Sequence, residues 1–178
     1  KVDSDIKSNK VSIEKTKKNI FVLGGTGYIG TYLITKLLKD TKNNVYTLIH
    51  NTIPKNKYEK VTYIKGDVTL EKFGLSDHLY NILNNKIDIV INCSADINWL
   101  KTFSELYKVN SYSILNIVKF CLTNNKYLLH LSSTSIFKND VERSLNINKI
   151  SEYPPNNGYS ETKWYCEKLL ELTLQKYK

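Results

Sequence analysis

The feature that most constrains this chain is a short apolar strand that runs directly into a glycine-rich turn. Residues 20–23 are four consecutive apolar residues, and Gly24, Gly27 and Gly30 follow at intervals of three. Residues 28–39 then carry a leucine-rich face with helical spacing. In this context the glycines allow a tight turn, close approach of the backbone to a pyrophosphate, and close packing of the helix on the strand. The segment therefore predicts a dinucleotide site with the phosphates near the helix N-terminus, rather than an ordinary turn.

A second signal lies far downstream, where Gly158 opens a segment that contains Tyr159 and Lys163. Residues four apart lie one turn apart on the same face of a helix. The Lys163 ammonium is therefore expected beside the Tyr159 phenol, where it would lower the pKa of that phenol by favouring the phenolate. Upstream, an apolar run near residues 127–132 releases hydroxyl residues, among them Ser133, at its C-terminal end. In a doubly wound sheet this end of a strand is where ligands bind.

The rest of the chain alternates between short apolar runs and longer amphipathic segments. This alternation predicts right-handed crossovers and a doubly wound parallel α/β sheet, a Rossmann fold with strand order 3-2-1-4-5. We expect one domain over residues 19–178, a polar linker over residues 1–18, and an irregular active-site loop over residues 137–157. Strands are predicted near residues 20–23, 45–50, 61–64, 87–92 and 127–132, and helices near residues 28–39, 75–84, 103–123 and 159–177.

In this order and spacing, the glycine triplet, the serine-rich strand end and the Tyr/Lys pair resemble the extended short-chain dehydrogenase/reductase family. The resemblance runs from about Asn19 to the end of the chain and implies an NAD(P)-dependent oxidoreductase. The catalytic residues that it implies are Asn110, Ser133, Tyr159 and Lys163. The cofactor-binding residues that it implies are Gly24, Thr26, Gly27, Tyr28, Ile29, Gly30, His50, Asp67, Val68, Cys93, Ser94, Ala95, Tyr159 and Lys163.

Within that family the chain looks like the thioester-reductase branch, the terminal reductase domains of polyketide and nonribosomal peptide synthases and of carboxylic acid reductases. Sugar-nucleotide epimerases and dehydratases share the glycine triplet and the Tyr/Lys pair, but they usually lack the Gly-Leu-Ser-Asp and Asn-Trp segments found here. The resemblance to the branch rests on residues 66–69 with 73–77, residues 95–99 with 105–106 and 109–110, and residues 158–164.

Two features depart from that branch. Its members often place an arginine at the end of the second strand to bind the 2′-phosphate of NADP, whereas this chain has His50. No acidic residue follows to bind a free 2′-hydroxyl, which disfavours NAD, so we interpret His50, Lys55 and Lys57 as a cationic pocket for NADP. The connection over residues 51–60 is also shorter than the insert that branch members often carry.

The resemblance implies hydride transfer from a reduced nicotinamide to a carbonyl carbon. Tyr159 would donate a proton to the carbonyl oxygen with the help of Lys163, while Ser133 hydrogen-bonds that oxygen. For an acyl thioester on the phosphopantetheine arm of a carrier domain, the product is an aldehyde or an alcohol. Two other functions stay open: a sugar-nucleotide epimerase or dehydratase that releases no oxidised product, and a non-catalytic nucleotide-binding remnant.

The composition limits the classes of partner that we expect for this chain. The chain begins at Lys1 and contains no methionine among its 178 residues, so we expect a piece of a larger polypeptide, inactive without a substrate-binding portion. The net charge is +9, but only Arg143 among the 26 basic residues is an arginine, which disfavours nucleic-acid recognition. No apolar run approaches the roughly 20 residues of a membrane span.

The three cysteines, Cys93, Cys121 and Cys166, are far apart in the sequence. They fit the reduced thiols of a cytoplasmic protein better than disulfides or a metal cluster. His78 and His130 have no metal-like partners at a suitable spacing, so no metal is expected. His130 falls inside a predicted strand and is interpreted as a buried or half-buried structural residue.

Overall fold

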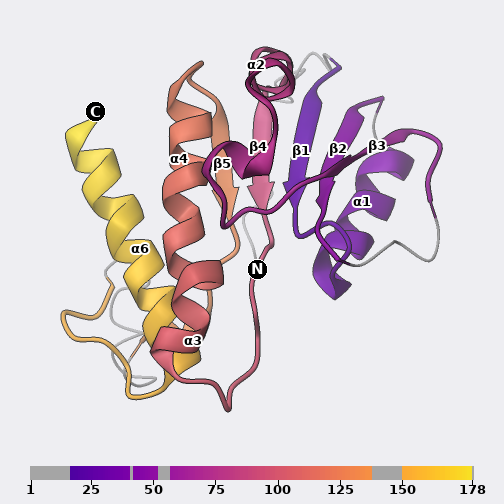
Figure 1. Ribbon diagram of the computed structural model, residues 1–178. Helices are drawn as coiled ribbons and strands as arrows, with labels where there is room; N and C mark the ends of the chain where they lie inside the picture. Colours follow the sequence, from indigo (N-terminus) through magenta and orange to yellow (C-terminus); the bar gives the residue numbers. More distant parts are fainter. Residues whose placement is uncertain (1–16, 41, 52–56, 138–149, 178) are drawn as a thin grey trace, which may run out of the picture.

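The computed structural model describes residues 17–40, 42–51, 57–137 and 150–177. A parallel sheet with strand order β3-β2-β1-β4-β5 forms its centre and confirms the predicted doubly wound fold (Figure 1). The strands are β1 (Asn19–Leu23), β2 (Asn44–Ile49), β3 (Val61–Lys65), β4 (Ile89–Asn92) and β5 (Tyr127–His130). The longer helices are α1 (Tyr28–Asp40), α2 (Asp77–Lys86), α4 (Ser113–Leu122) and α6 (Gly158–Lys176), and α3 (Phe103–Tyr107) is a short one.

Alternate residues of β1 enter two separate cores, because successive side chains of a strand point to opposite faces of the sheet. Ile20 and Val22 pack with Ile34, so α1 covers one face. Phe21 and Leu23 belong to a larger cluster on the opposite face, to which α2, α4 and α6 contribute side chains. The two cores explain why residues 20–23 are apolar without alternation, as is typical of a parallel strand buried on both sides.

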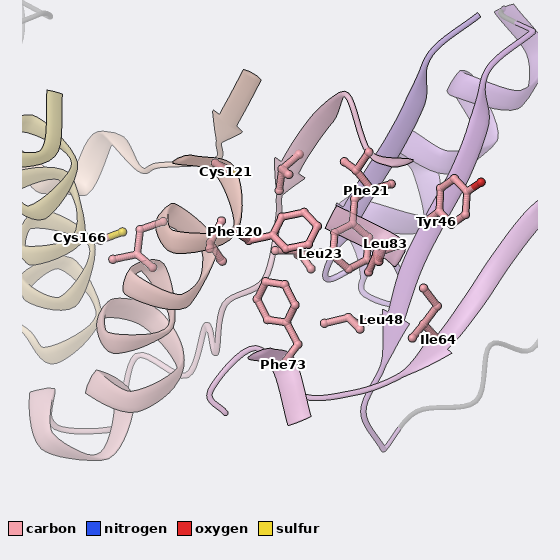
Figure 2. Close-up of a cluster of buried hydrophobic side chains, with 14 residues drawn as sticks. Phe21, Leu23, Tyr46, Leu48, Ile64, Phe73, Leu83, Phe120, Cys121 and Cys166 are labelled. Atoms are coloured by element: carbon pink, nitrogen blue, oxygen red, sulfur yellow. The ribbon is translucent and has the colours of Figure 1, made fainter. Parts of the chain in front are cut away.

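An aromatic cluster forms the centre of the larger core (Figure 2). The ring centroids of Phe21, Phe73 and Phe120 lie 5.4–5.9 Å from one another, in tilted or edge-on arrangements that aromatic rings favour. Phe73 lies in a 3-10 turn (Glu71–Gly74), where it has a positive φ of 59° although it carries a side chain. Because such a conformation is strained, burial of the Phe73 ring is what holds the turn, and with it the segment that follows β3.

The segment predicted as one helix over residues 103–123 is interrupted. It begins with a capping box, in which Thr102 and Glu105 satisfy each other's backbone N–H groups. A π-helical turn (Lys108–Tyr112) then separates α3 from α4. Such turns occur frequently at functional sites, and this one contains the buried side chain of Asn110.

The topology places a crevice at the carboxyl ends of β1 and β4. These strands are neighbours, but the chain leaves β1 toward β2 and leaves β4 toward β5, on opposite sides. Ligands of doubly wound proteins bind at such a switch point. Most of the predicted linker and the stretch 138–149 of the predicted loop lie outside the described residues, whereas residues 150–157 contain no helix or strand. No helix in the described ranges has the length and apolarity needed to cross a bilayer.

Candidate active site

A groove of about 360 Å³ opens at this switch point. Most of the residues predicted to bind the cofactor line it, although they come from four separate segments of the chain. These predicted residues are Gly24, Thr26, Gly27, His50, Asp67, Val68, Cys93, Ser94 and Ala95. The groove is also lined by Lys108 and Val109, which the sequence analysis missed. Their position just before Asn110, in the same turn, is the signal that would have identified them.

The three glycines of the first loop have different surroundings. Gly24 has a φ of +76°, and a Cβ there would lie 2.7 Å from the Cys93 carbonyl carbon. A Cβ at Gly30 would overlap the Gly24 carbonyl oxygen, so this glycine allows α1 to pack under the loop. A Cβ at Gly27 would meet only the Gly24 oxygen, at 3.2 Å, and would otherwise enter open space at the groove. Gly24 and Gly30 are therefore required by the fold, whereas Gly27 keeps the groove free for a ligand.

The bare backbone of the loop fits a dinucleotide phosphate group. Gly27 is exposed at the start of α1, where the first N–H groups of a helix have no partner within the helix. Five predicted cofactor residues do not line the groove: Tyr28, Ile29, Gly30, Tyr159 and Lys163. Tyr28 is 95% exposed and Ile29 is 50% exposed, whereas Gly30 is buried beneath the loop. The cofactor role of these three residues at the start of α1 stays a prediction.

The end of the groove near β2 and β3 combines a histidine with an acid. His50 Nε2 lies 3.4 Å from Asp67 Oδ2, and the His50 side chain is 63% exposed. The Asp67 carboxylate is fixed because its Oδ1 accepts a hydrogen bond from the Thr69 N–H at 2.8 Å. Of the predicted cationic pocket, Lys55 lies outside the described residues and Lys57 is exposed. A protonated His50 would therefore have its charge partly offset by Asp67.

Tyr159 lies at the start of α6, which packs closely against the segment that follows β4. A Cβ at Gly158 would lie 2.6 Å from the Phe103 nitrogen, so only glycine permits this approach. The Tyr159 phenol and the Ser133 hydroxyl are hydrogen-bonded to each other. The Trp99 indole packs on the Tyr159 ring with centroids 4.8 Å apart. The predicted pair of hydroxyl groups, Ser133 and Tyr159, is thus brought together from segments 26 residues apart in the sequence.

Lys163 does not have the effect on Tyr159 that the sequence analysis predicted. Its Nζ donates a hydrogen bond to the Leu131 carbonyl oxygen at 3.0 Å, and the residue is 3% exposed. Burial raises the pKa of Tyr159, and the hydrogen bond from Ser133 opposes this rise. The prediction that Lys163 lowers the Tyr159 pKa is therefore wrong for this state of the protein. Helical spacing put both residues on one side of α6, but it did not reveal that a strand-end carbonyl would bind the ammonium.

The Lys163 ammonium nonetheless acts on the groove. Burial raises the pKa of the Cys93 thiol, and the positive charge of Lys163 opposes that rise. Burial also lowers the pKa of Lys163 itself. Because Cys93 lines the groove, the charge of Lys163 is felt at the groove.

The side-chain amide of Asn110 is hydrogen-bonded to other protein groups. Its Oδ1 accepts from the Asp96 N–H at 2.7 Å, and its Nδ2 donates to the Asp96 carbonyl at 2.9 Å and to Thr162 Oγ1 at 3.2 Å. The amide therefore pairs with the backbone of the segment after β4 and ties it to α6. This geometry favours a positioning role over direct contact with a substrate.

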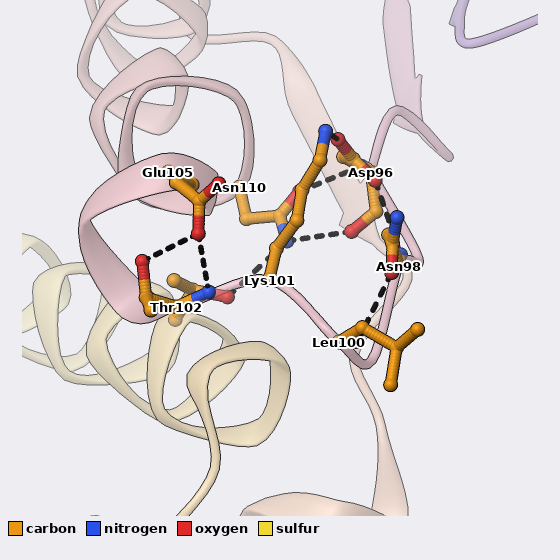
Figure 3. A network of polar contacts seen from close by, with 8 residues as sticks. Asp96, Asn98, Leu100, Lys101, Thr102, Glu105 and Asn110 are labelled. Carbon is orange, nitrogen blue, oxygen red and sulfur yellow. Dashed lines mark hydrogen bonds and ion pairs between the residues drawn. The ribbon is translucent and has the colours of Figure 1, made fainter.

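A polar network fixes the loop that follows Asp96 (Figure 3). The Asp96 carboxylate binds the Lys101 ammonium at 2.7 Å and accepts from the Asn98 N–H at 3.0 Å. Asn98 Oδ1 in turn accepts from the Leu100 N–H at 3.0 Å. Large apolar side chains point outward from this fixed loop, among them Trp99 beside Tyr159 and Leu100, which is 95% exposed. The sequence analysis recognised Trp99 only as part of a motif and missed its contact with Tyr159.

Comparison with known proteins finds relatives in sequence and in fold. A polyketide synthase-nonribosomal peptide synthetase, phmA, of Phaeosphaeria nodorum is 28% identical over 170 residues, which are 90% of this chain and 4% of that protein. The terminal R domain from the myxalamid PKS-NRPS biosynthetic pathway superposes with a TM-score of 0.73 at 19% identity, covering 90% of this chain and 47% of that one.

Two further solved structures show the same fold. A thiolation-reductase di-domain from an archaeal nonribosomal peptide synthetase has a TM-score of 0.68 at 17% identity, covering 90% of this chain and 39% of that one. The dTDP-glucose 4,6-dehydratase of Bacillus anthracis, solved with NAD, has a TM-score of 0.70 at 16% identity, covering 90% and 51%. The chain thus spans about half the length of the solved chains, or less, and only a few per cent of the synthetase.

The family profile described as male sterility protein, an NAD-binding family, matches residues 22–178. The predicted resemblance is confirmed in that the chain matches a polyketide synthase-nonribosomal peptide synthetase in sequence and the two reductase structures in fold. This chain belongs to the male sterility protein family of NAD-binding domains.

Proposed function

We propose that this chain is the nucleotide-binding and catalytic part of an NADP-dependent reductase that releases a carrier-bound acyl thioester as an aldehyde or alcohol. The observation that carries the proposal is the hydrogen bond between the Ser133 and Tyr159 hydroxyls, in a chain whose switch-point groove is lined by Gly24 and Gly27. The relatives are large synthases, in which a thioester is the natural substrate to propose. A cytoplasmic location accompanies this proposal, because the three cysteines are free.

In this proposal the side chains act on the carbonyl oxygen of the thioester. A nicotinamide held in the groove would supply a hydride to the carbonyl carbon, so that negative charge would develop on the oxygen. Tyr159 donates a proton to that oxygen, and Ser133 donates a hydrogen bond to it, so the two hydroxyls that now contact each other would share one substrate atom. The resulting hemithioacetal collapses to an aldehyde and a free thiol.

Lys163 has a different part in the same reaction. The raised pKa of Tyr159 keeps the phenol protonated and therefore ready to donate. Once the proton has left, a phenolate remains, and an ammonium nearby stabilises it. The Lys163 ammonium binds the Leu131 carbonyl here and does not contribute to the Tyr159 pKa, so it would have to turn from that carbonyl toward the phenolate to serve this step.

The cofactor and the partner belong to the same proposal. NADP is preferred over NAD because no acidic residue ends β2, where a free 2′-hydroxyl would be bound, and His50 stands there instead. The partner is a carrier domain with a phosphopantetheine arm. Neither nucleic acid nor membrane enters the proposal.

The test is a stoichiometric assay on the full-length protein. NADPH oxidation, aldehyde or alcohol formation, and thiol release are measured together with a carrier-bound or coenzyme A thioester. The expected result is one free thiol for each aldehyde formed, with NADPH consumed in proportion. Turnover of a sugar nucleotide without net NADPH oxidation would instead indicate an epimerase or dehydratase, of the kind that the dehydratase superposition suggests. Tight nucleotide binding without turnover of either substrate would indicate a non-catalytic domain.

A further inference from the structure

Behind the groove, a chain of hydrogen bonds joins β4, β5 and α6. Asn92 and His130 are register partners at the ends of β4 and β5. Asn92 Nδ2 lies 3.0 Å from His130 Nδ1, and His130 Nε2 lies 3.4 Å from Cys166 Sγ. The residue Cys166 is fully buried on α6, and Asn92 is buried as well. The sequence analysis interpreted His130 only as structural, and the proposed reaction does not use it.

The direction of each hydrogen bond follows from one backbone donor. The Ser94 N–H donates to Asn92 Oδ1 at 3.0 Å, so the Asn92 amide oxygen faces Ser94 and its NH₂ group faces His130. An NH₂ group can only donate, and His130 Nδ1 must therefore accept. A neutral imidazole whose Nδ1 accepts carries its hydrogen on Nε2, and that hydrogen points to the Cys166 sulfur.

This chain connects the two halves of the site. Asn92 fixes Ser94, which lines the nucleotide groove. Cys166 lies three residues after Lys163, on the same side of α6. The Leu131 carbonyl, next to His130 in the sequence, accepts the hydrogen bond from the Lys163 ammonium. The end of β5 therefore touches α6 at two points, once through His130 and once through Leu131.

We infer that His130 is a positioning residue that works as the neutral Nε2–H tautomer and sets Lys163 and α6 in place relative to the Ser94 segment of the groove. Its importance for catalysis rests on the proposed function, whereas the tautomer and the tethering do not. Protonation of His130 would place a second donor opposite the Asn92 NH₂ group and break the chain.

The surroundings of His130 keep it neutral. Burial is the main cause that lowers the pKa of His130 to about 4, and the charge of Lys163 adds to this effect. Burial raises the pKa of the Cys166 thiol to about 12, so no thiolate is present to attract a proton to the ring. Other titratable groups line the two cavities that His130 also lines: Tyr32, Lys36, Cys93, Cys121, Lys126, Tyr127 and Glu167.

The first test reads the tautomer directly. Long-range ¹H–¹⁵N spectra of the labelled protein resolve the ring nitrogens of its three histidines, and His50 and His78 serve as internal references. At neutral pH, His130 is expected to show a protonated Nε2 and an unprotonated Nδ1, and to keep that form until the pH approaches about 4. A protonated Nδ1 at neutral pH would overturn the inference.

The second test uses a substitution that replaces one hydrogen-bond donor with an acceptor. Asn92→Asp keeps the side-chain size and the acceptor for Ser94, but it presents an oxygen to His130 Nδ1 and should force a proton onto that nitrogen. We expect kcat to fall on the order of 10- to 100-fold, because small displacements of catalytic groups have effects of this size. The Kd of NADPH should stay unchanged, since the contact with Ser94 remains. Cys166→Ala, which leaves Asn92 in place, should keep the Nε2–H tautomer and serves as the matched control.

Substitutions of His130 itself complete the test. His130→Leu should lower kcat as Asn92→Asp does, and His130→Asn should restore part of the loss, because its amide oxygen can accept from Asn92. Wild-type kcat in a folded Asn92→Asp protein would overturn the positioning role. If the wild-type protein reduces no thioester, the proposed function fails, but the tautomer of His130 and its change in Asn92→Asp still decide the inference.

Discussion

The two ends of the site are built in different ways. Backbone forms the phosphate end of the groove, where Gly24 and Gly30 leave no room for a Cβ and Gly27 keeps an open surface. Side chains form the proposed catalytic end, where Tyr159, Ser133 and Lys163 are placed by hydrogen bonds that cross between distant segments. A substitution in the first region should act on folding or binding, whereas one in the second should act on the reaction.

The largest effect is expected for Tyr159→Phe. The ring and its packing on Trp99 remain, but the proton donor is lost, and positioned proton transfer contributes typically 10²- to 10⁴-fold to a rate. We expect kcat for thioester reduction to fall by about that factor, with the NADPH Kd and the melting temperature close to those of the wild type. Ser133→Ala should be milder, since it removes one hydrogen-bond donor to the developing oxyanion. Full turnover by the Tyr159→Phe protein would show that the pair is structural.

The next largest effects are expected at the glycines, where substitutions of Gly30 and Gly27 should change different properties. Gly30→Ala should destabilise the fold, because its Cβ would overlap the Gly24 carbonyl and overpacking costs about 1–3 kcal/mol. Gly27→Leu should leave the melting temperature nearly unchanged while weakening NADPH binding by at least about tenfold, or about 1.4 kcal/mol. Chemical denaturation and nucleotide titration of both variants measure the two quantities. Unchanged nucleotide affinity in folded Gly27→Leu would contradict the proposed binding mode.

These contrasts also explain what the sequence could predict. The fold and the groove followed from local patterns: β1, the glycine triplet and α1 are consecutive, and the strand bounds agree with the predicted ones to within two residues. The hydroxyls proposed as catalytic were predicted from a motif, but their contacts were not. Nothing local indicates that Leu131 would bind Lys163, that Trp99 would cover Tyr159, or that Asn110 would interrupt a helix with a π turn. Such contacts depend on how segments meet in space, which spacing along the chain does not encode.

A smaller effect is expected at the adenosine end, where His50 lies beside Asp67. Exposed charge contacts are worth about 0.2–1 kcal/mol, so His50→Ala should weaken NADPH binding by no more than about fivefold. NADH binding should hardly change, and the difference should shrink with added salt. Lys119→Ala, at an exposed lysine of α4 outside the groove, is the control. Tighter binding of NADH than of NADPH by the wild type would contradict the NADP preference.

The smallest predicted effect concerns the free energy of unfolding. It tests whether the buried Lys163 side chain destabilises the fold. Burial is the main cause that lowers the pKa of Lys163 below its usual 10.5 in the folded protein. The unfolded chain therefore binds this proton more tightly, and the folded state is disfavoured at every pH below the folded pKa. This penalty declines as the pH rises through the folded pKa toward 10.5, where both states lose the proton.

Lys163→Met removes the charge but keeps a side chain of similar length. The Leu131 carbonyl loses its hydrogen-bond donor, which costs about 1 kcal/mol of stability. Because this loss offsets most of what removal of the buried charge gains, the net increase in stability should be small. We expect the variant to melt at or slightly above the wild-type temperature at pH 7, with the difference moving against the variant as the pH approaches 10.5. Thermal melts at several pH values measure this, while thioester reduction by the same variant should fall sharply. A variant clearly less stable than the wild type at pH 7 would show that the ammonium supports the fold, and the contrast between the two ends of the site would then not extend to Lys163.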